Sequence, residues 1–422
     1  MNLLHVSAHY GGGVGTVMNA WKDNDELNHH VFTHLNDIPM NTGQLFDVGM
    51  ISEKYDVVIC HVWNHPSMFE FLVNTTLPPC RMIIWSHVSG LRAPDVYSTR
   101  LIEYPDKFVF TTPISYQCKE IMGLPDGLKG KLDEIWSTYD ISRYKLAQRV
   151  PHDGFNVGFT GTANYGKLHH KFIEMCANVK SPVKFIVCSH DSQEHLKFEA
   201  QKIGAYDRFE FKGKVPDVAE HLVGCDVFGY PLQPSHFGSC EQAIGEAMAC
   251  GTVPVVLGSP TERYIVTHME TGIVAENERE YSEAIDFLYK NRDELKRMSY
   301  NARVDAARRY DVKAIVRKWN FTIENVMKEE KRARSWSHTK APPYLVYTTS
   351  LGIYGEPFIR YVFADCIGNN KSKDEAIDLI KALYATNSSF FSESKGGVKQ
   401  YLRYYQRDRY IQEWAKLLTI GG

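Results

Sequence analysis

Short apolar strands alternate with amphipathic helical segments along most of this chain, and this alternation constrains its fold more than any other feature. The predicted buried strands of the first third are residues 2–6, 55–62, 81–86 and 107–111. A second series follows at residues 155–161, 183–189, 208–212 and 226–231. Strands that alternate with helices form parallel sheets with right-handed crossovers, so we predict an α/β fold with two Rossmann-like domains.

The length of the chain fits two such domains and a further segment. With 422 residues, 44% of them hydrophobic, the chain exceeds what one hydrophobic core supports. Pro151 and Gly154 indicate a linker that begins near residue 150. We predict an N-terminal domain at 1–150, a second Rossmann-like domain at 151–310, a crossover helix at 311–335 that returns to the first domain, and a mainly helical extension at 336–422.

Charge and composition exclude some classes of protein. The formal net charge of −2 argues against nucleic-acid binding over the whole surface. No apolar run approaches 18 residues in length, so we expect no transmembrane segment. The nine cysteines are odd in number and show no short-range pairing pattern, and residues 1–6 read as a strand rather than a leader, so we predict a reduced, cytoplasmic protein.

The strongest local signal is residues 238–257, which read as a loop, a helix and a strand. Ser239 is the predicted N-cap with Gln242 as its capping-box partner, and Gly251 ends the helix. A helix start offers free N–H groups and a partial positive charge, which suit a phosphate. Glu246 lies on an otherwise apolar helix and needs a partner, either a basic side chain of this chain or the hydroxyl groups of a ligand.

Residues 246–256, Glu-Ala-Met-Ala-Cys-Gly-Thr-Val-Pro-Val-Val, resemble the donor-site signature of nucleotide-sugar glycosyltransferases with the GT-B fold, specifically the large retaining family 4. The resemblance extends from a Gly-rich turn near the N-terminus to about residue 330. It implies two Rossmann-like domains that face a cleft. It also implies transfer from a nucleotide sugar, most often a UDP-sugar, with retention and with neither a metal nor another cofactor.

The same resemblance assigns the site that holds the leaving diphosphate. Residues 158–167 correspond to a family segment that carries an arginine and, a few residues later, a lysine. The lysine is present as Lys167, with Lys171 nearby, but Thr162 stands about where the arginine is expected. Hydroxyl and backbone donors would then assist the lysine. These donors would come from Thr160, Gly161 and Thr162.

Further donor contacts follow from the resemblance. Lys214 and Val215 fit the loop whose backbone reads the nucleotide base, and Glu246 fits the second family glutamate, which binds the ribose hydroxyls. The first family glutamate, eight residues earlier, is replaced by a glycine. For Glu241, compensation of the helix dipole is favoured over a catalytic role. Recognition of the sugar ring would fall to His236, Gly238, Ser239 and Cys240.

The first domain offers a Gly-rich turn and three histidines near strand ends. Gly12 and Gly13 form either an ordinary tight turn or, as the resemblance implies, the backbone that faces the donor pyrophosphate. His87 follows a strand, and the resemblance makes it a catalytic contact to the transferred sugar. Burial in the core is the alternative for it. A metal site of His61, His65 and His87 lacks a Cys or carboxylate at typical spacing, so we expect no metal.

The extension carries an excess of basic residues. From Lys331 to the end there are 14 Lys plus Arg and 8 Asp plus Glu. A last helix is predicted at 398–418, and its stripe of aromatic and basic residues either binds an acidic acceptor or packs as a helix face with its charges in water. The stripe consists of Tyr401, Arg403, Tyr404, Tyr405, Arg407, Arg409 and Tyr410.

These signals together predict a retaining glycosyltransferase that moves a sugar from a nucleotide sugar to a hydroxyl of a glycan or glycoconjugate. Its catalytic residues would be His87, Lys167 and Glu246. One alternative is a glycosyltransferase that modifies a DNA base through the basic extension, and steep salt dependence would favour it. The other is a non-catalytic module that binds a nucleotide sugar, suggested by the missing arginine and first glutamate.

Overall fold

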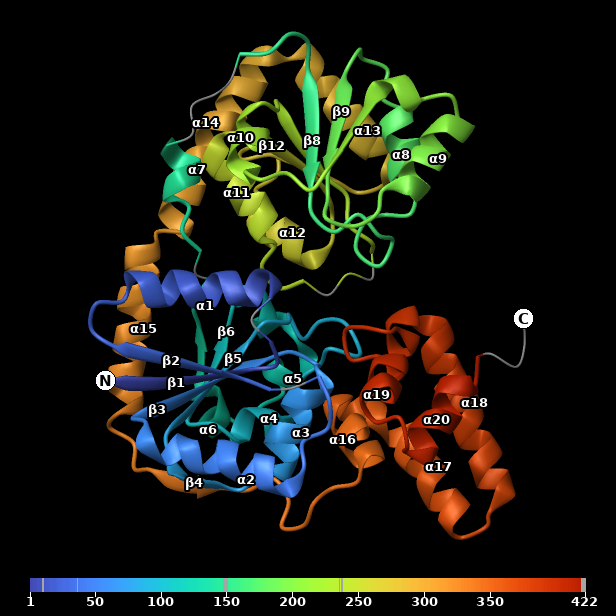
Figure 1. The fold of residues 1–422 in the computed structure, drawn as a ribbon. Coiled ribbons are helices and arrows are strands. Elements are labelled where there is room, and N and C mark those ends of the chain that lie inside the picture. Colours follow the sequence, from blue (N-terminus) through green and yellow to red (C-terminus); the bar gives the residue numbers. More distant parts are fainter. Residues whose placement is uncertain are drawn as a thin grey trace. The chain divides into compact units, whose positions relative to one another are not determined.

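The computed structural model describes residues 1–9, 11–35, 37–137, 139–146, 151–234, 236 and 238–418. The chain forms two compact units, coloured along the sequence in Figure 1. The first unit combines Met1–Trp136 with Val316–Gly422, and the second is the continuous stretch Ser137–Ile315. The domain boundary predicted at residue 150 lies outside the described residues.

The first unit is built on a parallel sheet with the strand order β2-β1-β3-β5-β6-β7. Its strands are β1 (Asn2–Ser7), β2 (His29–His34), β3 (Val57–Val62), β5 (Met82–Ser86), β6 (Lys107–Phe110) and β7 (Leu132–Glu134). Every residue of β3 and β5 is buried, as expected of a parallel sheet covered on both faces. The strand order reverses between β1 and β3, which places a topological switch point at their carboxyl ends.

Helices from both ends of the chain cover this sheet. Those of the N-terminal part are α1 (Gly12–Asn24), α2 (Thr42–Ile51), α3 (Pro66–Asn74), α4 (Thr99–Glu103), α5 (Lys119–Met122) and α6 (Asp126–Lys129). The C-terminal part adds α15 (Val312–Val326). Trp21 of α1 stacks on Trp319 of α15 at 4.1 Å between ring centroids, and both rings meet Trp85 of β5 edge-on. The sequence after residue 316 therefore completes the core of the first unit.

The chain continues beyond α15 to a strand, not as the long helix predicted up to residue 335. Strand β14 (Arg332–Arg334) pairs antiparallel with β4 (Leu77–Cys80). The Arg334 side chain is buried and forms an ion pair with Asp106. These tertiary partners explain why the charged segment leaves the helix.

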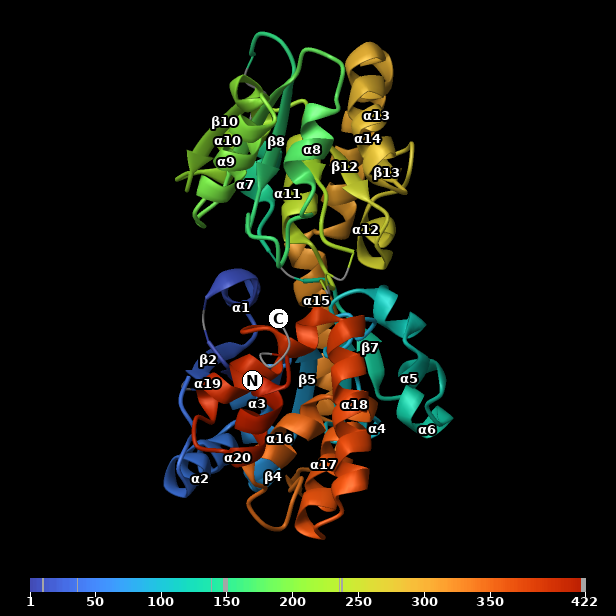
Figure 2. The same cartoon turned by 90° about the vertical axis from the view of Figure 1, so that its right-hand side faces the viewer.

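The extension beyond β14 is helical, as predicted. Its helices are α16 (Pro343–Ser350), α17 (Glu356–Cys366), α18 (Asn370–Thr386), α19 (Val398–Tyr404) and α20 (Arg409–Lys416). Helices α17 and α18 lie side by side, and α16 packs on α3 of the same unit (Figure 2). The single last helix predicted at 398–418 is wrong, because the Asp408 side chain accepts a hydrogen bond from the backbone of Ile411 and starts a new helix there.

The second unit holds another parallel sheet, in the order β10-β9-β8-β11-β12-β13. Its strands are β8 (Asn156–Thr160), β9 (Lys184–Cys188), β10 (Phe209–Gly213), β11 (Val227–Tyr230), β12 (Val253–Leu257) and β13 (Ile273–Ala275). Its helices are α7 (Ser142–Leu146), α8 (Phe172–Ala177), α9 (Glu194–Lys202), α10 (Val218–Val223), α11 (Gln242–Cys250), α12 (Pro260–Ile265), α13 (Glu278–Lys290) and α14 (Arg292–Arg309). The prediction of two Rossmann-like α/β sheets is confirmed.

Two further sequence predictions concern the membrane and the thiols. Within the described part of the chain, no helix is both long and apolar enough to cross a membrane. All nine cysteines are free thiols, and seven of them are buried. Burial raises the pKa of the Cys118 thiol to about 12, so this thiol is inert at neutral pH.

Candidate functional site

The second unit brings the predicted phosphate-binding elements together at its switch point. The strand order reverses between β8 and β11, and ligands of open α/β sheets bind at the carboxyl ends of such strands. Thr160 is the last residue of β8, Lys167 follows in the next loop, and Tyr230 is the last residue of β11. The loop after β11 leads into α11, which carries Glu246.

A buried ionic cluster lies between these elements. Lys167 Nζ is 3.0 Å from Oε2 of Glu241, and the Tyr230 hydroxyl donates to the same oxygen at 2.9 Å. Nε2 of His236 lies 2.9 Å from the other carboxylate oxygen, Oε1. The ammonium also lies 5.5 Å from the centroid of the Tyr230 ring. Glu241 thus ties together the β8 loop, the end of β11 and the start of α11.

The electrostatics keep this cluster charged. Burial opposes the charge on Lys167, but the adjoining Glu241 carboxylate outweighs burial and raises the pKa of the lysine. Burial likewise disfavours the ionised form of Glu241, yet Lys167 and His236 hold its pKa well below the usual range. An ionised carboxylate only accepts hydrogen bonds, so His236 presents a protonated Nε2 to it.

One prediction about the start of α11 is wrong. The helix begins at Gln242, so Glu241 occupies the N-cap position and Ser239 lies two residues before it. Among the described residues, the Glu241 side chain makes no capping hydrogen bond, because its oxygens hold Lys167 and His236 and it is only 7% exposed. An ionised carboxylate at this place is still compatible with the predicted compensation of the helix dipole.

Gly238 is shaped by the same carboxylate. A Cβ atom at this position would lie 1.8 Å from Oε1 of Glu241 and 2.9 Å from Nε2 of His236. Its carbonyl accepts a hydrogen bond from the Thr261 hydroxyl at 2.6 Å. Gly238 stands where the first glutamate of the family pattern is expected. Its missing side chain leaves the space that the Glu241 side chain occupies.

The remaining predicted donor-site residues of this unit lie around the cluster. Oγ1 of Thr160 is buried and has no hydrogen-bond partner among the described residues. The Gly161 N–H is bound to the carbonyl of Cys188, so it is not a spare donor. Lys171 pairs with Glu278 at 3.2 Å, away from Lys167. Thr162 and Cys240 are partly exposed, and Ser239 is buried.

The predicted base-reading and ribose-binding residues occupy two further positions. Lys214 and Val215 follow β10, with Lys214 exposed and Val215 packed on Cys188 and Cys225. Glu246 lies at the fifth position of α11 and is partly exposed, and its charge raises the pKa of Tyr139 together with the burial of that ring. The structure thus brings Lys167, Tyr230, His236 and Glu241 into contact. Sequence reasoning missed Tyr230, although its place at a strand end was a usable signal.

The predicted residues of the first unit lie at the carboxyl ends of β1 and β5. Gly12 and Gly13 open α1 and are exposed, and Gly12 has a left-handed φ of +65°. His87 follows β5, and its Nε2 lies 2.9 Å from Nδ1 of His61. His65 instead caps α3. Among the described residues no three His, Cys, Asp or Glu side chains gather as metal ligands would, so the metal alternative gains no support.

Acid is expected to destabilise the first unit through its buried histidines. Burial lowers the pKa of His87 to about 3 and holds those of His5 and His61 well below the usual value. The unfolded chain, with histidine pKa values near 6.5, then binds more protons as the pH falls from about 6.5 towards 3. The free energy of unfolding should drop by up to about 1.4 kcal/mol per pH unit for each histidine.

Urea unfolding between pH 8 and pH 4.5 checks this expectation. The variant His87→Asn should show a shallower loss of stability, whereas His29→Asn, at an exposed position of β2, should keep the wild-type slope. A free energy of unfolding that does not change over this range would contradict the burial of the three histidines.

The aromatic stripe of the extension is a packed face formed by α19, the turn after it and the start of α20. Tyr401, Tyr404 and Tyr405 are at most 6% exposed, and the Tyr404 hydroxyl donates to the buried Glu70 at 2.7 Å. The arginines stay outside. The alternative of an acidic acceptor stacked on these tyrosines is therefore not supported.

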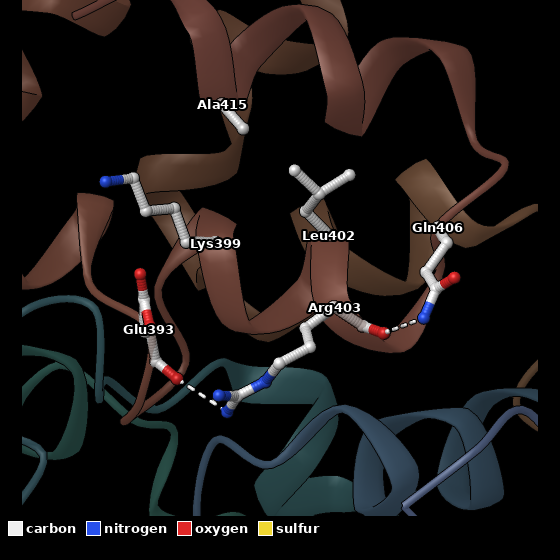
Figure 3. A pocket seen from close by; sticks show the side chains of 6 residues that line it. All are labelled: Glu393, Lys399, Leu402, Arg403, Gln406 and Ala415. Atoms are coloured by element: carbon white, nitrogen blue, oxygen red, sulfur yellow. Dashed lines mark hydrogen bonds between the residues drawn. The ribbon is translucent and has the colours of Figure 1, made fainter. Parts of the chain in front are cut away.

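A cavity of about 460 Å³ lies beside this face (Figure 3). The Arg403 guanidinium donates to the Glu393 carbonyl at 2.9 Å, and the Gln406 amide donates to the Arg403 carbonyl at 3.3 Å. Lys399 Nζ lies 4.2 Å from the centroid of the Phe391 ring. Both basic side chains at this cavity thus have partners within the extension.

The two Rossmann-like units define an α/β protein, and the second unit gathers a cation and a helix start at its switch point, where open sheets of this kind bind their ligands. Residues 141–305, which lie in the second unit, match the family model described as glycosyl transferases group 1. No protein with a curated description matches the sequence.

Solved glycosyltransferase structures share this fold. HepE of Anabaena, solved in complex with UDP-glucose, has a TM-score of 0.61 at 16% identity, with 77% of this chain and 100% of HepE covered. A glycosyltransferase of Rickettsia africae has a TM-score of 0.63 at 13% identity, with 78% and 99% covered. Sucrose-phosphate synthase of Thermosynechococcus elongatus has a TM-score of 0.58 at 14% identity, with 78% and 100% covered.

The family match and the fold confirm two predictions made from the sequence. The chain has the two Rossmann-like units of the GT-B class, and the enzyme class is a glycosyltransferase.

Proposed function

We propose that this glycosyltransferase takes its sugar from a nucleotide sugar, with a UDP-sugar as the donor, and transfers it with retention to a hydroxyl of a glycan or glycoconjugate. The observation that carries the proposal is the Lys167–Glu241–His236 cluster at the switch point of β8 and β11. The Anabaena structures solved with UDP, and with UDP-glucose, support the choice of donor for this fold.

Lys167 would meet the charge of the leaving diphosphate. An ammonium group has three N–H donors, and Glu241 and Tyr230 take at most two of them, so one donor remains for a phosphate oxygen. Glu241 acts as a positioning residue because it holds Lys167 against the end of β11. The N–H groups at the start of α11 add a partial positive charge, so charge development on the leaving group is met without a metal in this scheme.

Glu246 would bind the ribose hydroxyls of the donor. It lies little more than one turn inside α11 and is partly exposed. His87 would contact the transferred sugar. Lys214, Val215, Gly12 and Gly13 keep their predicted roles towards the base and the pyrophosphate. We also propose a cytoplasmic location.

A binding and turnover assay tests this function. The purified full chain is screened by thermal shift and donor hydrolysis against a panel of nucleotide sugars, with free nucleotides as controls. We expect one UDP-sugar to raise the melting temperature and to be hydrolysed slowly. Stabilisation by none of the nucleotides or nucleotide sugars would overturn the donor site.

The variant Glu246→Gln sharpens the assay. Loss of hydrogen bonds to a charged acceptor is worth about 1.5–3 kcal/mol, so the donor Kd should rise about 10- to 100-fold. The matched control is Glu220→Gln, an exposed position on α10 of the same unit, for which the Kd should not change. Equal affinities for both variants would remove Glu246 from the ribose site.

A further inference from the structure

Four histidines form one hydrogen-bonded chain across the sheet of the first unit. His30 of β2, His5 of β1, His61 of β3 and His87 after β5 lie on neighbouring strands. Their ring nitrogens are 2.9 Å apart at each of the three junctions, His30–His5, His5–His61 and His61–His87. The far end of this histidine chain is Asp25, whose Oδ2 lies 3.1 Å from Nε2 of His30.

Asp25 is held as an acceptor of hydrogen bonds. Its carboxylate accepts from the Asn28 amide at 2.8 Å, from the Leu27 N–H at 3.0 Å and from the Trp21 indole at 3.2 Å. Burial favours the neutral acid, but the hydrogen bonds from His30, Asn28 and Leu27 outweigh it and keep the pKa of Asp25 well below the usual value. An ionised Asp25 can only accept, so Nε2 of His30 must donate.

With His30 as a neutral imidazole, the direction of this first bond fixes every other one. A neutral imidazole has one N–H and one lone pair, so the lone pair of His30 is on Nδ1 and accepts from Nε2 of His5. By the same rule Nδ1 of His5 accepts from Nε2 of His61, and Nδ1 of His61 accepts from Nε2 of His87. The last ring therefore carries its proton on Nε2 and its lone pair on Nδ1.

Burial keeps the two central rings of the histidine chain neutral. His5 and His61 are fully buried, and the Trp21 and Trp85 rings lie 5.2 and 5.5 Å from them between centroids. Burial is the largest cause that lowers the pKa of both rings. A charge on a neighbouring histidine would lower it further, whereas the Asp25 carboxylate raises the pKa of His5. Burial in this aromatic surrounding penalises an imidazolium and strengthens each neutral hydrogen bond.

We infer that Asp25, His30, His5 and His61 are positioning residues that hold His87 as its Nε2–H tautomer, with Nδ1 as the hydrogen-bond acceptor. The role of His87 towards a sugar rests on the proposed function. An acceptor at Nδ1 binds a hydroxyl group of the sugar and rejects an unprotonated phosphate oxygen, which is itself an acceptor. The histidine chain thus assigns His87 to a sugar hydroxyl and leaves the diphosphate to the second unit.

NMR of the full chain labelled with ¹⁵N-histidine tests the inference. Two-bond ¹H–¹⁵N spectra at pH 7.5 distinguish the two neutral tautomers from the imidazolium, and His87→Gln assigns the His87 signals. We expect Nε2–H for His87 in the wild-type protein. An Nδ1–H tautomer or an imidazolium would overturn the inference. This spectrum is recorded without substrate, so its outcome stands whether or not the proposed function holds.

The variant Asp25→Asn tests the origin of the direction. An amide can donate to His30 as well as accept, so both tautomers of His87 should become populated, and kcat/KM should fall about 5- to 10-fold, the worth of one neutral hydrogen bond. The control His29→Asn changes the neighbour of His30 on β2, which is exposed, and should leave the spectrum unchanged. A folded Asp25→Asn protein with the wild-type tautomer would show that Asp25 does not set it.

Discussion

The variant Lys167→Met is expected to lower the free energy of unfolding by about 3–5 kcal/mol and to reduce kcat/KM by about 100- to 1,000-fold. The loss of stability follows because Glu241, 7% exposed, would keep its charge without its ammonium partner 3.0 Å away. The loss of activity follows if Lys167 meets the charge of the leaving diphosphate. Urea unfolding and steady-state transfer measure the two effects separately.

The double variant Lys167→Met/Glu241→Gln separates the effect of the ion pair on stability from the effect of the lysine on sugar transfer. With no buried carboxylate left unpaired, most of the lost stability should return, because replacing both members of a buried pair is often nearly neutral. Transfer should stay low, since the cation is still missing. A double variant that regained transfer would show that Lys167 serves only to neutralise Glu241.

A second lysine of the same unit provides the control for the stability effect. Lys171 pairs with Glu278, but both side chains are more than 40% exposed. Exposed ion pairs contribute about 0–1 kcal/mol, so Lys171→Met should leave the free energy of unfolding nearly unchanged. A large loss for Lys171→Met would mean that burial does not explain the difference between the two lysines.

Gly245→Ala is expected to destabilise the second unit by about 1–3 kcal/mol or more, although alanine is the better helix former by about 1 kcal/mol. Gly245 lies on the buried face of α11, where a Cβ atom would come within 1.8 Å of the Tyr139 hydroxyl oxygen and 2.6 Å of the Tyr310 ring. Neither ring has room to withdraw, because both are at most 1% exposed. Denaturant unfolding measures the change.

Gly127→Ala is the matched control for this helix glycine. Gly127 also lies in a helix, α6, and a Cβ atom there would meet nothing within 4 Å. Its replacement should be neutral or stabilising by up to about 1 kcal/mol. Equal changes in stability at the two positions would mean that Gly245 is not needed for the close approach of α11 to the two tyrosines.

Gly245→Ala should also weaken donor binding, because Glu246 follows directly.

The strands that could be predicted from the sequence are those whose burial shows in their own residues. Residues 55–62 and 81–86 are apolar and became β3 and β5. Strand β2 was not predicted, because His29–His34 contains three histidines and shows no apolar pattern. His30 can be buried there because its ring donates a hydrogen bond to Asp25 and accepts one from His5. Such partners become visible only in three dimensions.

The candidate site was likewise predictable only where the local sequence carries the signal. Lys167 and Glu246 lie in segments that resemble a known donor site, so their positions could be named in advance. The buried ion pair of Glu241 could not be, because compensation of the helix dipole, the role predicted for it, requires no buried partner. The burial of Glu241 depends on Lys167 from another loop and on Tyr230 from the end of β11. Neither residue belongs to the helix that was predicted from the local sequence.

The discontinuous make-up of the first unit has a consequence for the order of folding during synthesis. Its core includes Trp319 of α15, and its strand β4 pairs with β14, so residues 1–136 leave the ribosome without the helix and strand that complete them. The second unit, Ser137–Ile315, is continuous and is available in full first. We therefore expect nascent chains cut near residue 315 to hold a protease-resistant second unit and an unprotected N-terminal segment, and protection of that segment to follow only after β14 has emerged.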